Sequence, residues 1–304
     1  MAATCSLWMV PFFLNWLVLI FAIIHMPENF GFVTWLAASG IFIFLLAFYF
    51  GLGLRLLKLF GVLQPATESL KVLVTEVSEK MQVPVRATWI LSTYVGNAFA
   101  LPQTRQLIFT DKLLETLSRE ETKAICAHEL GHLSESRGVI LVRGLAAFAF
   151  YPLIFVRPLG ALNDYGAFWI LFVACFLLLL IGSRVARRME KRADKIAVES
   201  VADGAIYAQA LERLYEINLT PAVMSRRTTK IHPNLYDRMM AAGVTPDFPK
   251  PLPPQRQSWT SSLMYVCIFF TFFFFFTWRN RPATSNAHFQ HFSQPASSFN
   301  LTKP

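Results

Sequence analysis

Charged side chains are scarce in this sequence of 304 residues, because Asp, Glu, Lys and Arg make up only 15% of it, whereas 54% is hydrophobic. Soluble domains carry about 25% charged residues, so the composition argues against a soluble protein. Cysteine pairs are also missing: the four cysteines form no CxxC motif, and three of them lie in apolar runs. This excludes a disulfide framework and a cysteine-ligated zinc site.

Basic residues are absent before Arg55. A secretory signal peptide opens with a positively charged segment before a short apolar stretch. We therefore expect the first apolar run to be retained in the protein.

Long apolar runs are abundant, and about 20 apolar residues suffice to cross the roughly 30 Å hydrocarbon core of a membrane. Residues 7–24 and 30–54 flank a short polar stretch and predict a transmembrane hairpin over 1–54. A third strong run covers 165–182. Its partner is the run 139–156, which is apolar apart from one arginine.

The second predicted hairpin therefore occupies residues 139–182, and Arg143 is its only charged residue at membrane depth. A phenylalanine-rich run at 263–278 is long enough only for a short fifth span. The sequence thus predicts a mainly α integral membrane protein with four to five transmembrane helices, in contact with the lipid bilayer.

Positive charge follows two of these spans. Arg55 and Lys58 come after the second, and five basic residues lie at 184–192 after the fourth. Positive residues beside span ends mark the cytoplasmic side, so we expect both polar regions and the N-terminus there, at the plasma (inner) membrane. Because the basic cluster abuts a span and does not alternate with aromatic residues, no nucleic-acid partner is predicted.

The first polar region, residues 55–138, begins with an amphipathic helix. Three short segments follow, at 87–92, 97–101 and 106–110, and predict a small antiparallel sheet. A capping-box pattern at Ser118 then opens a helix, for which Gly138 supplies the stop signal.

The second polar region, residues 183–245, predicts two helices divided near Asp203 and a third that opens at His232. Residues 246–262 form a Pro-rich linker, and the polar tail at 279–304 is expected to be disordered.

The helix after the capping box carries His128, Glu129 and His132. Residues four apart lie one above the other on a helix, so the two histidines can present ring nitrogens to one ion. This HExxH arrangement is typical of zinc peptidases, in which the glutamate is the general base. Such a motif also arises by chance, in which case it is a solvated polar turn, so its context decides.

A catalytic zinc takes three protein ligands and keeps one position for water. Glu190 is the leading third ligand, because the second hairpin leaves the membrane surface near Gly138 and returns near Ser183. Asp194 shares a helix face with Glu190 and can accept the ring N–H of a ligating histidine. The alternative for Glu190 is a salt bridge with the neighbouring basic residues.

Together these motifs resemble the HtpX-type membrane metallopeptidases of family 48, a family that also includes the CAAX prenyl endopeptidases. The resemblance rests on the HExxH helix, the Glu190 and Asp194 pair, the segment 97–100, and His232-Pro233 followed by Arg238. It implies a gluzincin-type α+β zinc peptidase domain, with one zinc per chain held by His128, His132 and Glu190.

The resemblance also implies roles for the remaining motifs. Glu129 is the base, His232 hydrogen-bonds the oxygen of the tetrahedral intermediate, and Arg238 supports it. An edge strand binds substrate in extended form, as in β-augmentation, and it consists of Asn97, Ala98, Phe99 and Ala100. In the alternative reading, the segment is an ordinary strand and His232 only a helix-start residue.

The sequence therefore predicts a zinc metalloendopeptidase that cleaves membrane or misfolded proteins on the cytoplasmic side. The main alternative is a non-catalytic zinc-binding membrane scaffold, against which Glu129 argues because a structural site needs no base. A transporter would carry more charge at membrane depth.

Overall fold

The structure is a computed structural model that describes residues 10–162, 165–201, 203–223 and 233–252. The chain divides into two compact units, residues 1–255 and 256–304, and the second contains no described residue. Three predicted features therefore lie wholly or mostly outside the described residues: the fifth span at 263–278, the tail at 279–304 and the linker at 246–262.

The first apolar region forms α1 (Val10–His25) and α2 (Phe32–Ala47). α2 continues through a π-helical turn, η2 (Phe48–Leu52), into α3 (Gly53–Leu59), and the helix axis changes where Gly51 adopts a φ of 105°. Their outward side chains are large, apolar and exposed, as expected of helices that face lipid.

The second apolar region does not fold as two straight spans. α7 (Arg137–Ala147) is followed by a 3₁₀ turn, η3 (Tyr151–Phe155), and by α8 (Val156–Ala161), with a 42° bend between the two halves. Pro152 explains the break, because proline has no N–H for a helix to use and disfavours helical geometry in the preceding residue.

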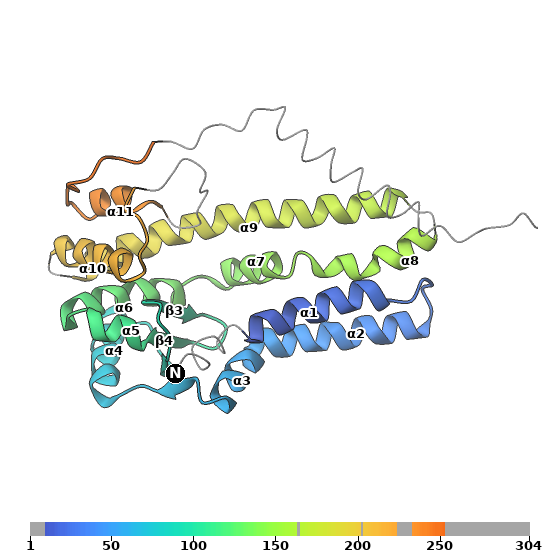
Figure 1. The fold of residues 1–304 in the computed structure, drawn as a ribbon, viewed down its shortest axis with the longest axis horizontal. Helices are drawn as coiled ribbons and strands as arrows, with labels where there is room; N and C mark the ends of the chain where they lie inside the picture. The colour runs from blue at the N-terminus through green and yellow to red at the C-terminus, as the bar shows by residue number, and fades with distance from the viewer. Residues whose placement is uncertain (1–9, 163–164, 202, 224–232, 253–304) are drawn as a thin grey trace, which may run out of the picture. The chain divides into compact units, whose positions relative to one another are not determined.

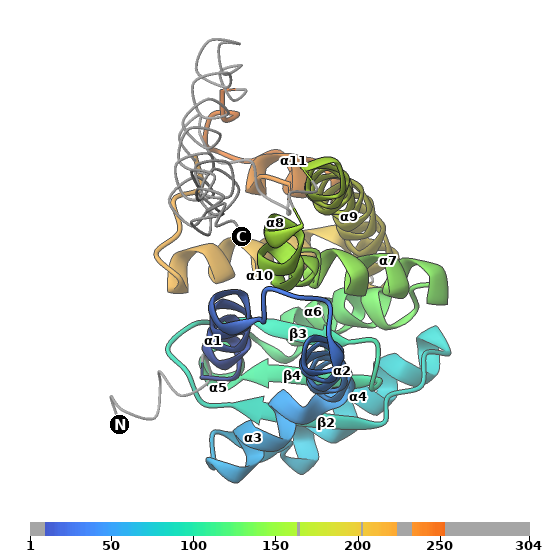
Figure 2. The same cartoon turned by 90° about the vertical axis from the view of Figure 1, so that its right-hand side faces the viewer.

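α9 (Tyr165–Ser200) is a single helix of 36 residues. At 1.5 Å per residue it is about 54 Å long, enough to cross a membrane and continue well beyond it. α7 and α9 run side by side (Figures 1 and 2), and they approach closely where a side chain at Gly182 would clash with Ala146.

Two of the described helices are long and apolar enough to cross a membrane, Phe32–Leu59 and Trp169–Ser200, and the bent pair makes a third if it counts as one span. The apolar part of α1, Phe13–His25, is shorter. Arg157 of α8 and Glu28 of the α1–α2 loop form an ion pair of 2.7 Å, so the outer ends of the two hairpins lie together. The count of four to five spans stays a prediction.

The sheet has four strands in the order β1-β2-β4-β3: β1 (Leu63–Pro65), β2 (Ala87–Leu91), β4 (Gln106–Thr110) and β3 (Ala98–Leu101). The predicted antiparallel sheet is wrong in one pairing, because β2 and β4 are parallel. β3 and β4 form a hairpin, and β4 is inserted next to β2. This order leaves β3 at the edge of the sheet.

Five helices complete the polar body: α4 (Glu68–Met81), α5 (Asp111–Thr116), α6 (Arg119–Leu133), α10 (Gly204–Ile217) and α11 (Leu235–Ala241). They share one apolar core with the sheet, in which Leu107, Phe109, Leu130 and Tyr207 are fully buried. A second cluster, around Ile108, packs the other side of the sheet against α3.

The predicted zinc helix is shorter than expected. Its capping box is present, because Ser118 accepts from the Glu121 N–H and Glu121 accepts from the Ser118 N–H, yet α6 ends at Leu133. Gly138 lies inside the next helix, which Ser136 caps. The chain therefore turns toward the apolar region directly after the second histidine.

Candidate metal and active site

Helix α6 presents both histidines of its HExxH motif on one side. The His128 and His132 rings lie 5.0 Å apart between centroids and are nearly perpendicular. His128, Glu129 and His132 are all buried, with 6–8% of each residue exposed. Three buried polar side chains on one short stretch of helix need polar partners, because an unpartnered buried polar group is costly.

Helix α9 supplies one such partner, Glu190. Its Oε2 lies 3.7 Å from His128 Nε2, and its Oε1 lies 3.5 Å from His132 Nε2. One ligand atom from each of the three residues can be chosen so that all three lie within 4.8 Å of one another. Two helices thus bring the predicted metal-binding trio together, although His132 and Glu190 are 58 residues apart in the sequence.

A glycine lets these two helices approach. A Cβ atom at Gly131 would lie 3.1 Å from the Cα of Ala193 and 3.2 Å from its Cβ. Arg192 adds a polar tie, because it donates to the Gly131 carbonyl at 2.9 Å and to the Ser134 hydroxyl at 3.0 Å. α6 and α9 are therefore held in close contact at the level of the trio.

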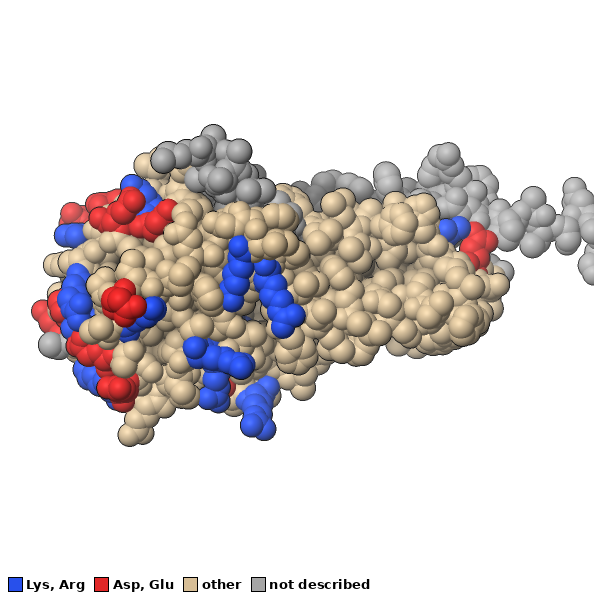
Figure 3. Space-filling model, turned by 90° about the horizontal axis from the view of Figure 1, so that it is seen from below, with Lys and Arg blue, Asp and Glu red and all other residues tan. Residues whose placement is uncertain are grey.

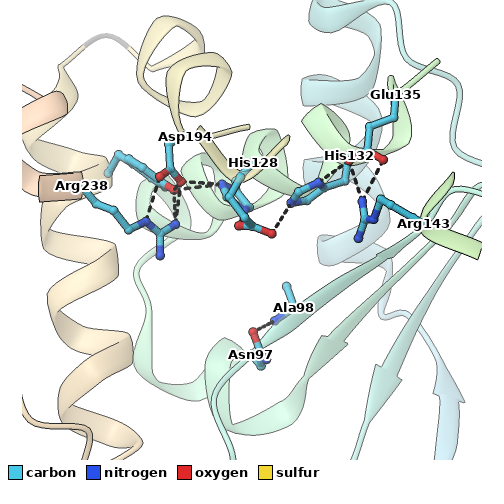
Figure 4. A network of polar contacts seen from close by, with 10 residues as sticks. Asn97, Ala98, His128, His132, Glu135, Arg143, Asp194 and Arg238 are labelled. Carbon is cyan, nitrogen blue, oxygen red and sulfur yellow. Dashed lines mark hydrogen bonds and ion pairs between the residues drawn. The ribbon is translucent and has the colours of Figure 1, made fainter. Parts of the chain in front are cut away.

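The Nδ1 atom of His128 faces a buried polar cluster on α9, α10 and α11 (Figure 4). Asp194 Oδ1 lies 3.1 Å from that nitrogen, and the Tyr207 hydroxyl lies 3.0 Å from it. Arg238 donates to both oxygens of Asp194, at 3.0 and 2.7 Å, and to Tyr207 at 2.7 Å. Burial raises the pKa of Tyr207 well above its ordinary value, so its hydroxyl keeps its proton.

The Nδ1 atom of His132 has a matching partner. Glu135 Oε1 lies 2.8 Å from it, and Nη1 of Arg143 lies 2.7 and 2.8 Å from the two Glu135 oxygens. Burial lowers the pKa of His132, but the hydrogen bond to Glu135 and the charges of Glu129 and Glu190 outweigh it, so the pKa is raised. Burial raises the pKa of Glu135, but His132 and Arg143 reverse this and hold it below its ordinary value.

With each Nδ1 facing a carboxylate, both histidines are oriented so that Nε2 points toward Glu190. Two imidazole Nε2 atoms and one carboxylate are the ligand set of a catalytic zinc site, and a second carboxylate behind each histidine is the usual outer partner. The residues present therefore fit zinc.

A cavity of about 250 Å³ opens beside the trio. Its walls combine the edge strand, the apolar side chains Ile125, Leu211 and Leu214, and charged residues that include Glu129 and Arg143. The Thr110 N–H donates to the Asn97 carbonyl at 3.0 Å, and the Asn97 N–H donates to the Thr110 hydroxyl at 2.8 Å, so the backbone of Asn97 faces β4. Because backbone groups alternate in direction along a strand, those of Ala98 and Ala100 point away from the sheet. The Asn97 side chain accepts from the Ala98 N–H at 2.9 Å (Figure 4).

The structure thus gathers most of the sequence-predicted site residues around one cavity. The lining contains Asn97, Ala98, Phe99, Ala100, His128, Glu129, His132, Glu190 and Arg238, and Asp194 lies behind it. His232 lies outside the described residues. Three residues received no site role from the sequence: Tyr207, Glu135 and Arg143.

Comparison with known proteins assigns the chain to a class. The family described as peptidase family M48 matches residues 65–244, which is more than half of the sequence, so the chain belongs to peptidase family M48. The matched region begins before the first long helix of the polar body and ends just after α11. The family predicted from the motifs is therefore confirmed.

Curated relatives point to the same group. The chain is 24% identical over 196 residues to a protein named "Protease HtpX homolog" from Sulfurihydrogenibium sp., covering 58% of this chain and 65% of that one. It is 26% identical over 174 residues to a Protease HtpX homolog from Picrophilus torridus, covering 52% and 55%. A Protease HtpX from Pseudomonas putida is 27% identical over 159 residues, covering 46% and 54%. The matches thus span between about half and two thirds of these relatives.

Proposed function

We propose that this chain is a membrane-embedded, zinc-dependent endopeptidase that hydrolyses peptide bonds of membrane or misfolded proteins on the cytoplasmic side. The observation that carries the proposal is the convergence of His128, His132 and Glu190, with ligand atoms within 4.8 Å of one another, beside Glu129 and an edge strand. Membership of peptidase family M48 supports the reaction class.

His128, His132 and Glu190 would hold the ion, and Asp194 and Glu135 would fix the ring orientation of the histidines. When bound there, zinc lowers the pKa of a water molecule toward 7 and polarises the scissile carbonyl. A site with three protein ligands leaves room for that water, whereas a structural site is usually closed by four.

Glu129 is one residue past His128, is buried, and lines the cavity without belonging to the trio. It is placed to take a proton from the attacking water and to deliver it to the leaving nitrogen. The substrate would lie in extended form along β3, where the Ala98 carbonyl and both backbone groups of Ala100 point outward, while the Ala98 N–H donates to the Asn97 side chain. Pairing through the backbone makes few demands on sequence, which suits a range of unfolded substrates.

The membrane placement rests on sequence and charge together. Figure 3 shows Lys and Arg gathered, with hardly any Asp or Glu among them on the visible face, between a long uncharged stretch and an end of mixed charge. The exposed basic residues of this group follow the apolar stretches of the two long candidate helices and lie within those helices: Arg55, Lys58, Arg184, Arg187 and Arg188. This band supports a plasma-membrane (inner-membrane) protein whose active site faces the cytoplasm.

The test is cleavage of a denatured model protein by the full chain, purified in detergent and loaded with zinc. We expect Glu129→Gln to keep one zinc per chain and to lose cleavage, because the amide cannot act as a base. Glu120→Gln is the matched control, since Glu120 lies on the same helix, is exposed, and forms an ion pair only with Lys123 among the described residues. Equal cleavage by the Glu129→Gln and Glu120→Gln variants would overturn the assignment, and bound zinc without cleavage in the wild type would favour the non-catalytic scaffold.

A further inference from the structure

Arg143 is an unexpected residue for its position. It lies on α7 within the sequence VILVRGLAA, where every neighbour is apolar or glycine. A charge on such a helix is costly unless it faces the protein interior or a polar cavity and finds a partner. Its guanidinium does both, because it lines the cavity beside the metal trio and contacts Glu135.

Glu135 is one of the most thoroughly buried acidic side chains in the described part of the chain, with 1% of the side chain exposed. Its two oxygens accept hydrogen bonds from Nη1 of Arg143 at 2.7 and 2.8 Å. Oε1 also lies 2.8 Å from His132 Nδ1. Removing the cation would leave Glu135 with a buried charge and no compensation from α7. A buried carboxylate that loses its partner is no longer held in one position.

The arrangement repeats the one around the other histidine. His128 contacts Asp194, which in turn forms an ion pair with Arg238 on α11. In the same way, His132 contacts Glu135, which forms an ion pair with Arg143 on α7 (Figure 4). Each imidazole thus has a carboxylate, and each carboxylate has an arginine. The two arginines differ in origin, because α11 belongs to the polar body and α7 to the apolar hairpin.

Packing in the apolar region fixes where Arg143 lies. The next residue, Gly144, is buried against Tyr49 of η2, and a Cβ atom at Gly144 would lie 2.8 Å from the Tyr49 ring. α7 also packs along α9, which carries Glu190. The position of the guanidinium is therefore set by the contact between α7 and the segment that leads out of the second apolar helix.

We propose that Arg143 is a positioning residue for the metal ligand His132, acting through Glu135, and that it couples the metal affinity of the site to the packing of the membrane hairpin. This rests on the proposed function, since it takes His132 as a zinc ligand. Arg143 itself need not touch zinc or substrate. Its effect is to hold the Glu135 carboxylate in place through both oxygens, and thereby to hold the His132 ring with Nε2 toward Glu190.

The experiment measures the zinc dissociation constant of the full chain in detergent, by competition with a chelator. Losing the direct outer partner of a ligand typically weakens metal binding about 10-fold to 100-fold, and because Arg143 acts one step further out, through Glu135, we expect Arg143→Met to fall at about the lower end of that range. Arg143→Lys retains the charge and should recover part of the loss. Arg137→Met is the matched control, because Arg137 lies on the same helix, is exposed, and forms no ion pair within the described residues; it should bind zinc like the wild type.

A second pair of variants tests the coupling without touching any polar residue. Gly144→Ala crowds the Tyr49 ring at 2.8 Å, so that the ring or α7 must shift, and should weaken zinc binding several-fold where α7 shifts, whereas Gly138→Ala, whose Cβ would meet nothing within 4 Å, should leave it unchanged. This pair remains informative if Arg143→Met fails to fold. As a further readout, the visible absorption spectrum of the cobalt-substituted protein should change in Arg143→Met and keep its wild-type form in Arg137→Met.

The outcomes separate this inference from the proposed function. Wild-type zinc affinity in Arg143→Met and Gly144→Ala, together with weakened affinity in Glu190→Gln, would overturn the inference and leave the metal site intact. Wild-type affinity in Glu190→Gln would overturn the metal site itself. A raised KM in Arg143→Met at unchanged zinc affinity would make Arg143 a substrate contact and would also overturn its positioning role.

Discussion

The buried ion pair between Arg238 and Asp194 offers the sharpest test of how the site is supported. Both side chains are at most 9% exposed, and Arg238 donates three hydrogen bonds to Asp194 and Tyr207, at 2.7–3.0 Å. Arg238→Met retains much of the volume but leaves the carboxylate without its cation. Breaking a buried pair by removing one partner costs about 3–5 kcal/mol.

At about 2–4 °C per kcal/mol for a body of this size, the melting temperature should fall by roughly 6–20 °C. The control is Arg119→Met, because Arg119 and Glu76 form an ion pair of 3.1 Å with about half of each side chain exposed. Exposed pairs contribute about 0–1 kcal/mol, so this variant should melt within a few degrees of the wild type.

Both variants are compared by thermal unfolding of the metal-free, detergent-solubilised protein, so that zinc does not mask the difference. Equal melting temperatures for Arg238→Met and Arg119→Met would refute the reasoning, because they would show that the charge of Asp194 is compensated by water or by other groups. A large loss in Arg238→Met alone would support the cluster as a structural base for His128.

Two other predictions concern the helix contact and pH. Gly131→Ala should destabilise the protein by about 1–3 kcal/mol, because the new Cβ would crowd the Ala193 backbone at 3.1 Å. The control, Gly138→Ala, should be neutral or stabilising, because its Cβ would meet nothing within 4 Å. Thermal unfolding measures both variants. The raised pKa of His132 contributes stability to the metal-free protein that is present below about pH 6.5 and is lost as the pH rises through the folded-state value. The melting temperature of the metal-free wild type should therefore fall over that range more than that of His132→Gln, and parallel curves would contradict the assignment.

The metal trio could be predicted from the sequence because its geometry follows from short-range rules. A spacing of four places His128 and His132 on one side of a helix, and the return of the second hairpin brings Glu190 to them. Asp194 followed from the same spacing relative to Glu190. These predictions needed only helix geometry and the position of the membrane runs.

The polar support behind the trio could not be predicted in the same way. Glu135 lies three residues after His132, a spacing that brings side chains together on a helix, but its contact depends on α6 ending at Leu133 and on the turn that follows. Tyr207 gives no sequence signal, since its role depends on how α10 packs. Arg143 was visible only as a charge in an apolar run.

The sheet shows a similar limit. The three strand segments at 87–92, 97–101 and 106–110 were predicted within a residue or two, but their pairing was not. Consecutive short strands suggest successive hairpins, whereas here β4 lies between β2 and β3 and pairs in parallel with β2. Strand order depends on long-range packing against α6, which periodicity does not encode.

The most direct test of the central claim is a reconstitution of the metal-stripped, purified chain with zinc, in which bound metal and cleavage of a denatured protein are measured on the same sample. The proposed function predicts no cleavage in the stripped protein, full recovery at one zinc per chain, and no recovery in Glu129→Gln although it binds the same zinc. Cleavage that persists in the stripped protein, or that recovers equally in Glu129→Gln, would contradict it.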